Sequence, residues 1–144
     1  MRTKKVNRFW CDYCNKAGCS ASHMSRHEEG CTLNPNRTCG FCVKLLQQEQ
    51  SDIATIIASL PPESEYLKVE KLGDQEWTSY DSEYLNGILL PIIREKTGDC
   101  PACIMAVLRQ AYIPTPAVSD FDFKKERQDI WDDINDSHTQ RDYY

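Results

Sequence analysis

Four residues with zinc-ligand side chains lie within 21 residues of one another, in the pattern Cys11-x2-Cys14-x12-His27-x3-Cys31. Thiolate sulfur and imidazole nitrogen are the usual ligands of structural zinc, which binds four of them in a tetrahedron. A Cys-x2-Cys turn directs two sulfurs at one centre, and residues four apart share one face of a helix, so His27 and Cys31 can complete the set. The spacing therefore predicts a first zinc site.

Two further Cys-x2-Cys pairs, Cys39 with Cys42 and Cys100 with Cys103, are separated by 57 residues. Together they predict a second zinc site with four cysteine ligands. In both predicted sites, four protein ligands leave no open coordination position, so we expect both zinc ions to be structural. Because the metal closes a long loop, it also lowers the entropy of the unfolded chain. Of the eight cysteines, only Cys19 is left over.

Two other chemistries use similar cysteine pairs. Iron in a rubredoxin-like site also takes two Cys-x2-Cys pairs, but Gly follows the second cysteine there, whereas Val43 and Ile104 follow here. The segment from Cys100 to Cys103 alone resembles a thiol-redox motif, which uses a single pair. Zinc shared by both pairs explains the companion pair better than either alternative.

Length, composition and charge limit the class of protein. The 144 residues suffice for one domain. The sequence contains no stretch of 18 apolar residues, and the basic start is not followed by the apolar region of a secretory signal. We therefore expect a cytoplasmic protein without a membrane partner. Reduced thiols in the cytoplasm favour metal sites over disulfides.

The charge is distributed unevenly along the chain. Residues 1–50 hold eight basic against four acidic residues, and residues 51–144 hold nine basic against eighteen acidic residues. A phosphate backbone would be repelled by the acidic part.

The ligands must be positioned by a body that is mainly α with minor β structure. Apolar residues at helical intervals predict a helix within residues 43–60, ended by Pro61-Pro62. In residues 66–80, Gly73-Asp74 could turn a short hairpin that ends near Trp77.

A second helical stripe follows, made of Leu85, Ile88, Leu89, Ile92 and Ile93. Pro91 interrupts it, so we expect a kink or two short helices, ended by Gly98. Pro101 suits the first turn of a third helix, which would place Cys100 and Cys103 at a helix N-terminus. The positive end of the helix dipole there favours thiolate and hence metal binding.

Residues 9–31 resemble a C2H2-type zinc finger in its C2HC variant. Phe9 and Met24 stand at apolar positions of that family, whereas Gly18 replaces the mid-finger Phe and Cys31 replaces the second His. The resemblance implies a ββα-like or knuckle-helix unit. Its small core would rest on Phe9, Trp10 and Met24.

The same resemblance implies contacts to nucleic acid. The base-facing positions of the finger helix fall on Ser20, His23 and Arg26, and phosphates could be contacted by Lys4, Lys5, Arg8 and Lys16. One finger contacts about three base pairs and rarely suffices, and this chain adds only a basic arm, residues 1–8. These side chains otherwise form a solvated face or a protein interface.

Two residues of the finger could replace a predicted ligand. His23 lies four residues before His27, but its distance from Cys14 is short for a finger. Cys19 is expected to be a bystander thiol. We therefore predict His27 and Cys31 as the ligands.

A finger followed by Asn-Pro-Asn-Arg-x-Cys-x2-Cys, here residues 34–42, resembles small uncharacterised proteins of tailed bacteriophages. That resemblance implies a phage accessory or assembly protein. Its location would then be the host cytoplasm or the virion.

The acidic tail, residues 117–144, contains an amphipathic pattern made of Phe123, Ile130, Trp131 and Ile134. This stripe either docks on the core of the chain itself or forms a helix that binds in the groove of a partner.

We therefore divide the chain into a basic arm (1–8), a C2HC zinc finger (9–31), a helical body closed by the four-cysteine site (32–116) and the acidic tail. No nucleophile elbow, P-loop or dinucleotide glycine pattern occurs, so we expect no enzymatic role. The leading hypothesis is a zinc-binding adapter whose partner is another protein. The alternative is a regulatory protein that binds DNA or RNA through the finger.

Overall fold

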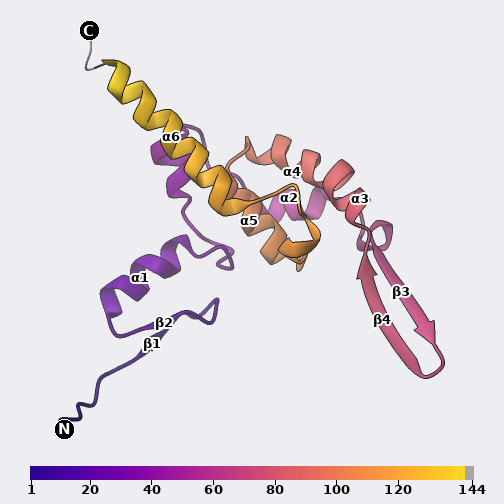
Figure 1. Cartoon of the computed structure of the whole chain (residues 1–144), viewed down its shortest axis with the longest axis horizontal. Helices are drawn as coiled ribbons and strands as arrows, with labels where there is room; N and C mark the ends of the chain where they lie inside the picture. The colour runs from indigo at the N-terminus through magenta and orange to yellow at the C-terminus, as the bar shows by residue number, and fades with distance from the viewer. Residues whose placement is uncertain (142–144) are drawn as a thin grey trace.

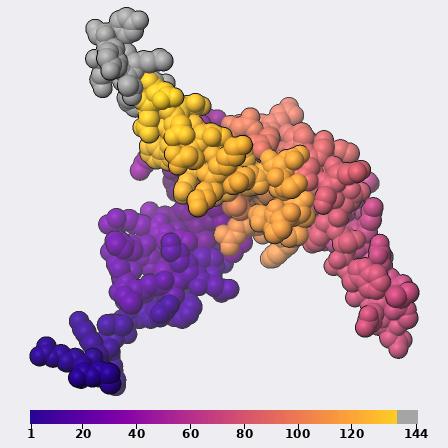
Figure 2. Space-filling view, viewed as in Figure 1, coloured from indigo at the N-terminus to yellow at the C-terminus, as the bar shows by residue number. Residues whose placement is uncertain are grey.

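The computed structural model describes the backbone of residues 1–141 and the side chains of residues 1–136. In this part the chain is mainly helical with two small antiparallel hairpins, which confirms the predicted fold class. A central helical body carries three projecting segments: the N-terminal region, the second hairpin and the last helix (Figure 1). The space-filling view in Figure 2 shows the same three projections. Residues 142–144 of the predicted tail lie outside the described residues.

The N-terminal region folds as a ββα unit. Strand β1 (Phe9–Trp10) pairs antiparallel with β2 (Ala17–Gly18), and α1 (Ala21–Gly30) follows. The side chain of Ser20 accepts a hydrogen bond from the backbone N–H of His23 at 3.4 Å, which satisfies one unpaired donor at the start of α1.

The small core of this unit differs from the predicted one in one residue. Met24 is buried and Phe9 packs against it, but Trp10 is 60% exposed, so its assignment to the core is wrong. Successive residues of a strand point to opposite faces, so an inward Phe9 turns Trp10 outward. Leu33, beyond the predicted finger, packs against the core instead.

The body is built around α5 (Pro101–Gln110), which is buried on nearly all sides. A helix that is apolar all round belongs in the centre of a core. Helix α2 (Ile53–Ser59), helix α4 (Leu90–Thr97) and helix α6 (Phe123–Arg141) pack against it. The loop after η4 (Thr115–Ala117) adds further apolar side chains to the core, namely Val118 and Phe121.

The helix predicted within residues 43–60 is wrong in its first half. A single π turn, η1 (Phe41–Leu45), comes first, and Gln47 then takes a left-handed backbone conformation with φ of 51°. Asp52 starts α2 afresh by accepting a hydrogen bond from the backbone N–H of Thr55. The carboxylate of Asp52 therefore sets the start of the helix, and the spacing of apolar residues carries no information about it.

The segment before Gly98 forms one continuous helical run with an interruption at the predicted place. It comprises α3 (Ser82–Tyr84), the π turn η3 (Leu85–Leu89) and α4. Pro91 has no N–H, and the N–H of Leu90 bonds to the carbonyl of Leu85, five residues back. The expected kink is therefore a π turn.

The predicted hairpin is present and longer than expected. Strand β3 (Leu67–Leu72) pairs antiparallel with β4 (Gln75–Tyr80) across a two-residue turn in which Gly73 has a positive φ. After Pro61-Pro62, the short η2 (Glu63–Glu65) leads into it. At its base, the ring of Tyr66 stacks between those of Tyr80 and Tyr84, with centroids 6.4 and 6.1 Å away.

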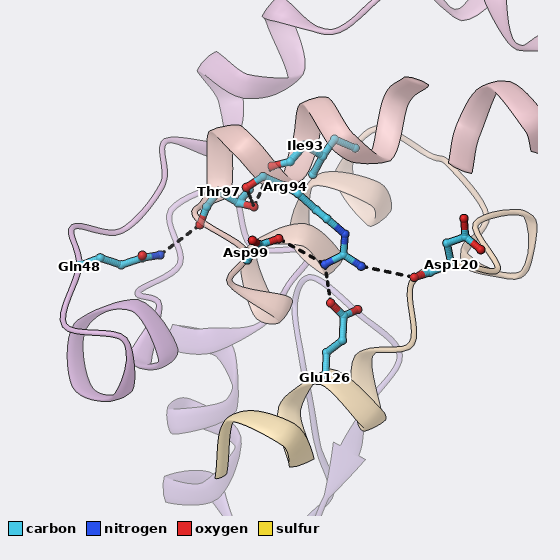
Figure 3. A network of polar contacts seen from close by, with 7 residues as sticks. All are labelled: Gln48, Ile93, Arg94, Thr97, Asp99, Asp120 and Glu126. Carbon is cyan, nitrogen blue, oxygen red and sulfur yellow. Dashed lines mark hydrogen bonds and ion pairs between the residues drawn. The ribbon is translucent and has the colours of Figure 1, made fainter. Parts of the chain in front are cut away.

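Helix α6 is held to the body at its N-terminal end (Figure 3). The guanidinium of Arg94 pairs with the carboxylate of Glu126 and donates to the carbonyl of Asp120 at 3.3 Å. It also pairs with Asp99 at 3.4 Å. The contact with Glu126 is the main reason that the pKa of Arg94 is raised. The C-terminal part of the helix extends away from the body (Figure 1).

Replacing Gly98 by alanine is expected to lower the free energy of unfolding by about 1–2 kcal/mol, because φ is +60° there. A Cβ would also lie 2.7 Å from the Gln48 side chain, which donates to Cys42 Sγ at 3.5 Å. The same side chain donates to the carbonyl of Thr97 at 3.1 Å (Figure 3). Denaturant unfolding of the zinc-loaded protein measures the change.

The matched control is Gly87→Ala. Gly87 is exposed within the helical run, and a Cβ there would contact nothing. It should stabilise the protein by about 0.4–1 kcal/mol through the unfolded chain. Equal changes in the free energy of unfolding for Gly98→Ala and Gly87→Ala would contradict the claim that the left-handed backbone at Gly98 requires glycine.

Candidate metal centres

The first predicted ligand set forms a cluster. The ligand atoms of Cys11, Cys14, His27 and Cys31 all lie within 4.8 Å of one another. The Sγ of Cys14 is 3.2 Å from Nε2 of His27, so the imidazole presents Nε2 to the common centre. Three thiolates and one imidazole are a complete zinc ligand set without an open position.

Backbone N–H groups support the sulfurs of this cluster. The N–H of Tyr13 donates to Cys11 Sγ and that of Lys16 to Cys14 Sγ, both at 3.4 Å. Burial alone would raise the pKa of Cys11, but hydrogen bonds from the N–H groups of Tyr13 and Cys14 help to lower it. The turn thus favours thiolate before any metal binds.

The helix contributes its ligands differently from the expected i, i+4 pair within α1. His27 lies in the last turn, whereas Cys31 lies one residue past the helix end with ψ of 128°. The N–H of Cys31 still bonds to the carbonyl of Glu28 at 3.3 Å, which fixes its position. The rival residues His23 and Cys19 are exposed and belong to neither cluster of the described residues.

The second predicted set also forms a cluster, and each of its four cysteines is at most 1% exposed. The Sγ atoms of Cys39 and Cys100 are 3.6 Å apart, those of Cys42 and Cys103 are 3.4 Å apart, and Cys103 Sγ lies 3.5 Å from Cys39 Sγ. Zinc–sulfur bonds of about 2.3 Å place tetrahedral sulfurs roughly 3.8 Å apart, so the set fits zinc. A disulfide would need about 2.05 Å.

The body supplies these cysteines from two elements. Cys39 and Cys42 flank the start of η1, while Cys100 caps α5 and Cys103 lies in its first turn, as predicted. The positive end of the α5 dipole stabilises the two thiolates. The four sulfurs are therefore held at the centre of the main apolar core.

Polar groups that sequence analysis did not identify surround the second cluster. Arg37 is buried, and its guanidinium lies 3.9 Å from Cys103 Sγ and donates to the carbonyl of Gly30 at 3.3 Å. Gln48 donates to Cys42 Sγ. Four thiolates with Zn²⁺ carry a net charge of −2, which the guanidinium partly offsets. Arg37 and Gln48 are close in sequence to Cys39 and Cys42, and this closeness is the feature of the sequence that could have identified them.

Without a metal, the four thiols hold their protons unequally. Hydrogen bonds from Cys100 and Cys103 lower the pKa of Cys39. Burial raises the pKa of Cys42 to about 11, and hydrogen bonds with Cys103 and Cys39 raise that of Cys100. A bound dication lets all four ionise together, so metal binding would release protons.

Hydrogen bonds connect the segment just after the first metal cluster to α5, which carries two ligands of the second cluster. Arg109 of α5 donates to the Thr32 hydroxyl at 2.7 Å, and Gln110 donates to the carbonyls of Thr32 and Asn34 at 2.9 and 3.3 Å. Together with the bond from Arg37 to Gly30, these contacts hold the ββα unit against the body.

The predicted nucleic-acid residues lie on the surface, apart from the half-buried Ser20. They are Lys4, Lys5, Arg8, Lys16, His23 and Arg26. The aromatic neighbour of Arg8 was not predicted: the guanidinium lies 5.4 Å from the ring centroid of Trp10. Tyr13 is exposed as well.

The predicted partner-binding residues divide between two rows of α6. Phe123 packs on the core, and Trp131, two turns on, is 42% exposed. Ile130 and Ile134 are half-buried on a neighbouring row. The Phe123 row and η1 border a cavity of about 430 Å³, which we call the α6–η1 groove, lined among others by Phe41, Lys44, Phe123, Arg127 and Trp131.

Comparison with protein-family models, curated proteins and solved structures found no match. In the described part of the chain, no helix is both long and apolar enough to cross a bilayer.

Proposed function

We propose that the protein is a non-enzymatic adapter, built on two structural zinc ions, that binds another protein in the α6–η1 groove. The ββα unit serves in it as a C2HC zinc finger. The closure of both metal sites supports this role: each cluster offers four protein ligands, which leaves no position for water or substrate on the metal. The function then depends on surfaces that the metals hold in place.

The chemistry of the groove defines the partner. Aromatic rings of Phe41, Phe123 and Trp131 line it, and Lys44 and Arg127 add positive charge, with the Arg127 guanidinium 5.7 Å from the Phe123 ring centroid. Within the described part of the chain, the residues that line it include no carboxylate. An apolar anchor side chain flanked by acidic residues would fit such a groove.

The resemblance of residues 34–42 to small phage proteins narrows the proposal further. The partner would then be a phage or host protein that takes part in assembly, met in the host cytoplasm or in the virion.

Photo-crosslinking of the full chain in its native cell tests the groove. A photoreactive side chain at Lys44 should capture one defined protein, and Arg127→Glu should lower that capture by about tenfold because it reverses the charge of the groove.

Lys125→Glu is the control. It makes the same charge change two residues earlier on α6, at an exposed position that does not line the groove. Equal capture by wild-type and Arg127→Glu proteins would reject the groove as the binding surface.

The second candidate function is nucleic-acid binding, favoured by the exposed Arg8–Trp10 stack and by Tyr13, which is also exposed. Bases stack on exposed aromatic rings while cations contact phosphates. This function requires salt-dependent binding of DNA or RNA that weakens in Trp10→Ala and in the double variant Lys4→Ala/Arg26→Ala. Binding that these changes leave unaltered would exclude it.

A further inference from the structure

The β3–β4 hairpin is a two-stranded sheet whose outer edges face no other strand in the described part of the chain. It projects away from the body (Figures 1 and 2), and Val69 is 53% exposed on it, with Leu72 and Trp77 exposed as well. An isolated hairpin is marginally stable, and an open edge offers unpaired N–H and C=O groups to a further strand. The hairpin therefore has the form of a pairing element.

The turn determines which residues of β3 can pair outward. Leu72 and Gln75 flank a two-residue turn and so form a hydrogen-bonded pair, and such pairs alternate along an antiparallel ladder. Consequently Leu67, Val69 and Lys71 direct their N–H and C=O groups away from β4. A new strand must match these outward groups with its own.

The sequence of β3, Leu-Lys-Val-Glu-Lys-Leu, has a pattern suited to pairing with itself. Two antiparallel registers match outward groups and pair five residues of each copy: one centred on Val69 and one centred on Glu70. The second register places Glu70 opposite Glu70 of the other copy. The first places Val69 opposite Val69 of the other copy. It also places Lys68 of each copy opposite Glu70 of the other, which gives two pairs of opposite charge. Like charges directly opposite are destabilising, so charge selects the register centred on Val69.

We propose that two copies of this protein pair through β3, antiparallel and centred on Val69, to form a four-stranded sheet. Lys68 and Glu70 of the second copy then occupy a non-hydrogen-bonded pair, where opposite side chains come closest. In the single chain Lys68 is 62% exposed and 3.6 Å from Asp81, while Glu70 accepts from Trp77 Nε1 at 3.0 Å. Both charges remain accessible to the second copy.

This pairing does not depend on the adapter role, because the hairpin is separate from the α6–η1 groove. A contact of two strands is small, so the dimer is weak and depends on concentration. Charge complementarity fixes its partner and register.

Sedimentation velocity of the zinc-loaded full chain, from about 10 to 500 µM, tests the pairing by measuring the dimer dissociation constant. Lys68→Glu and Glu70→Lys should each raise that constant at least about tenfold, since either change places like charges opposite each other twice. The double variant Lys68→Glu/Glu70→Lys should restore the wild-type value.

Lys71→Glu is the matched control: like Lys68→Glu it breaks an ion pair within the single chain, here with Glu76 at 3.8 Å, but Lys71 faces Leu67 of the second copy, so its charge reversal should change the constant little. The double variant keeps the unfavourable contact with Asp81, so its recovery reports pairing between copies. A monomer throughout the concentration range would overturn the proposal. So would a dimer that neither reversal weakens, or one that the double variant fails to restore.

Discussion

Replacing Cys100 by serine is expected to remove one of the two zinc ions and to unfold the helical body. Cys100 is fully buried, and its sulfur lies with three others inside the core cluster around α5. A serine hydroxyl does not replace a thiolate as a zinc ligand, and structural zinc contributes about 10–16 kcal/mol in small zinc domains. That exceeds the whole stability of most domains, so the body cannot keep its fold without it.

Native mass spectrometry and thermal unfolding check this expectation together. Wild-type protein should carry two zinc ions, and Cys100→Ser should carry one and lose the cooperative transition of the body. Cys19→Ser is the control, because Cys19 is exposed and outside both clusters, and it should keep both ions and the same melting temperature. Two bound zinc ions in Cys100→Ser would contradict the assignment of the second site.

The ligand sets could be predicted because zinc coordination is local chemistry. The Cys-x2-Cys turns and the Pro101 start of α5 are fixed by neighbouring residues, so the eight ligands were identified from the sequence. The ends of the helices around Gly98 and Pro61 were equally local. Each of these features depends on a residue whose backbone limits are known without the fold.

Features that depend on the approach of distant segments were not predictable. The apolar period of residues 43–60 could not show that Gln47 would take a left-handed conformation so that Gln48 reaches Thr97. The buried Arg37 meets Cys103 across 66 residues, and the α6–η1 groove exists only where two separate helical segments come together. These contacts come from tertiary packing, which periodicity in one segment does not encode.

The same distinction explains why the net charge of a segment did not predict the charge of the groove. Residues 51–144 are acidic as a whole, yet Arg127 within them joins Lys44, from another element, in a positive groove. The acidic residues of α6 lie on other rows of the helix. Net charge describes a segment, whereas recognition depends on the side chains that share one surface.

Replacing Cys31 by serine should unfold the ββα unit alone. The apolar cluster around Met24 is separate from the cluster around α5, and a unit of this size cannot hold a fold without metal. We therefore expect one zinc ion to be lost and the amide resonances of residues 9–31 to move to unfolded positions. Resonances of α5, such as those of Leu108, should stay in place.

The contacts between the two units are too few to spread this unfolding. Thr32 and Asn34 accept hydrogen bonds from Arg109 and Gln110, and Gly30 accepts one from Arg37. Each is worth about 0.5–1.5 kcal/mol, so their sum stays below the contribution of about 10–16 kcal/mol from the second zinc. The body should accordingly keep its thermal transition within a few degrees of wild type. Loss of that transition in Cys31→Ser would show that the two zinc sites stabilise one cooperative unit, and the Cys100→Ser variant would then lose both ions.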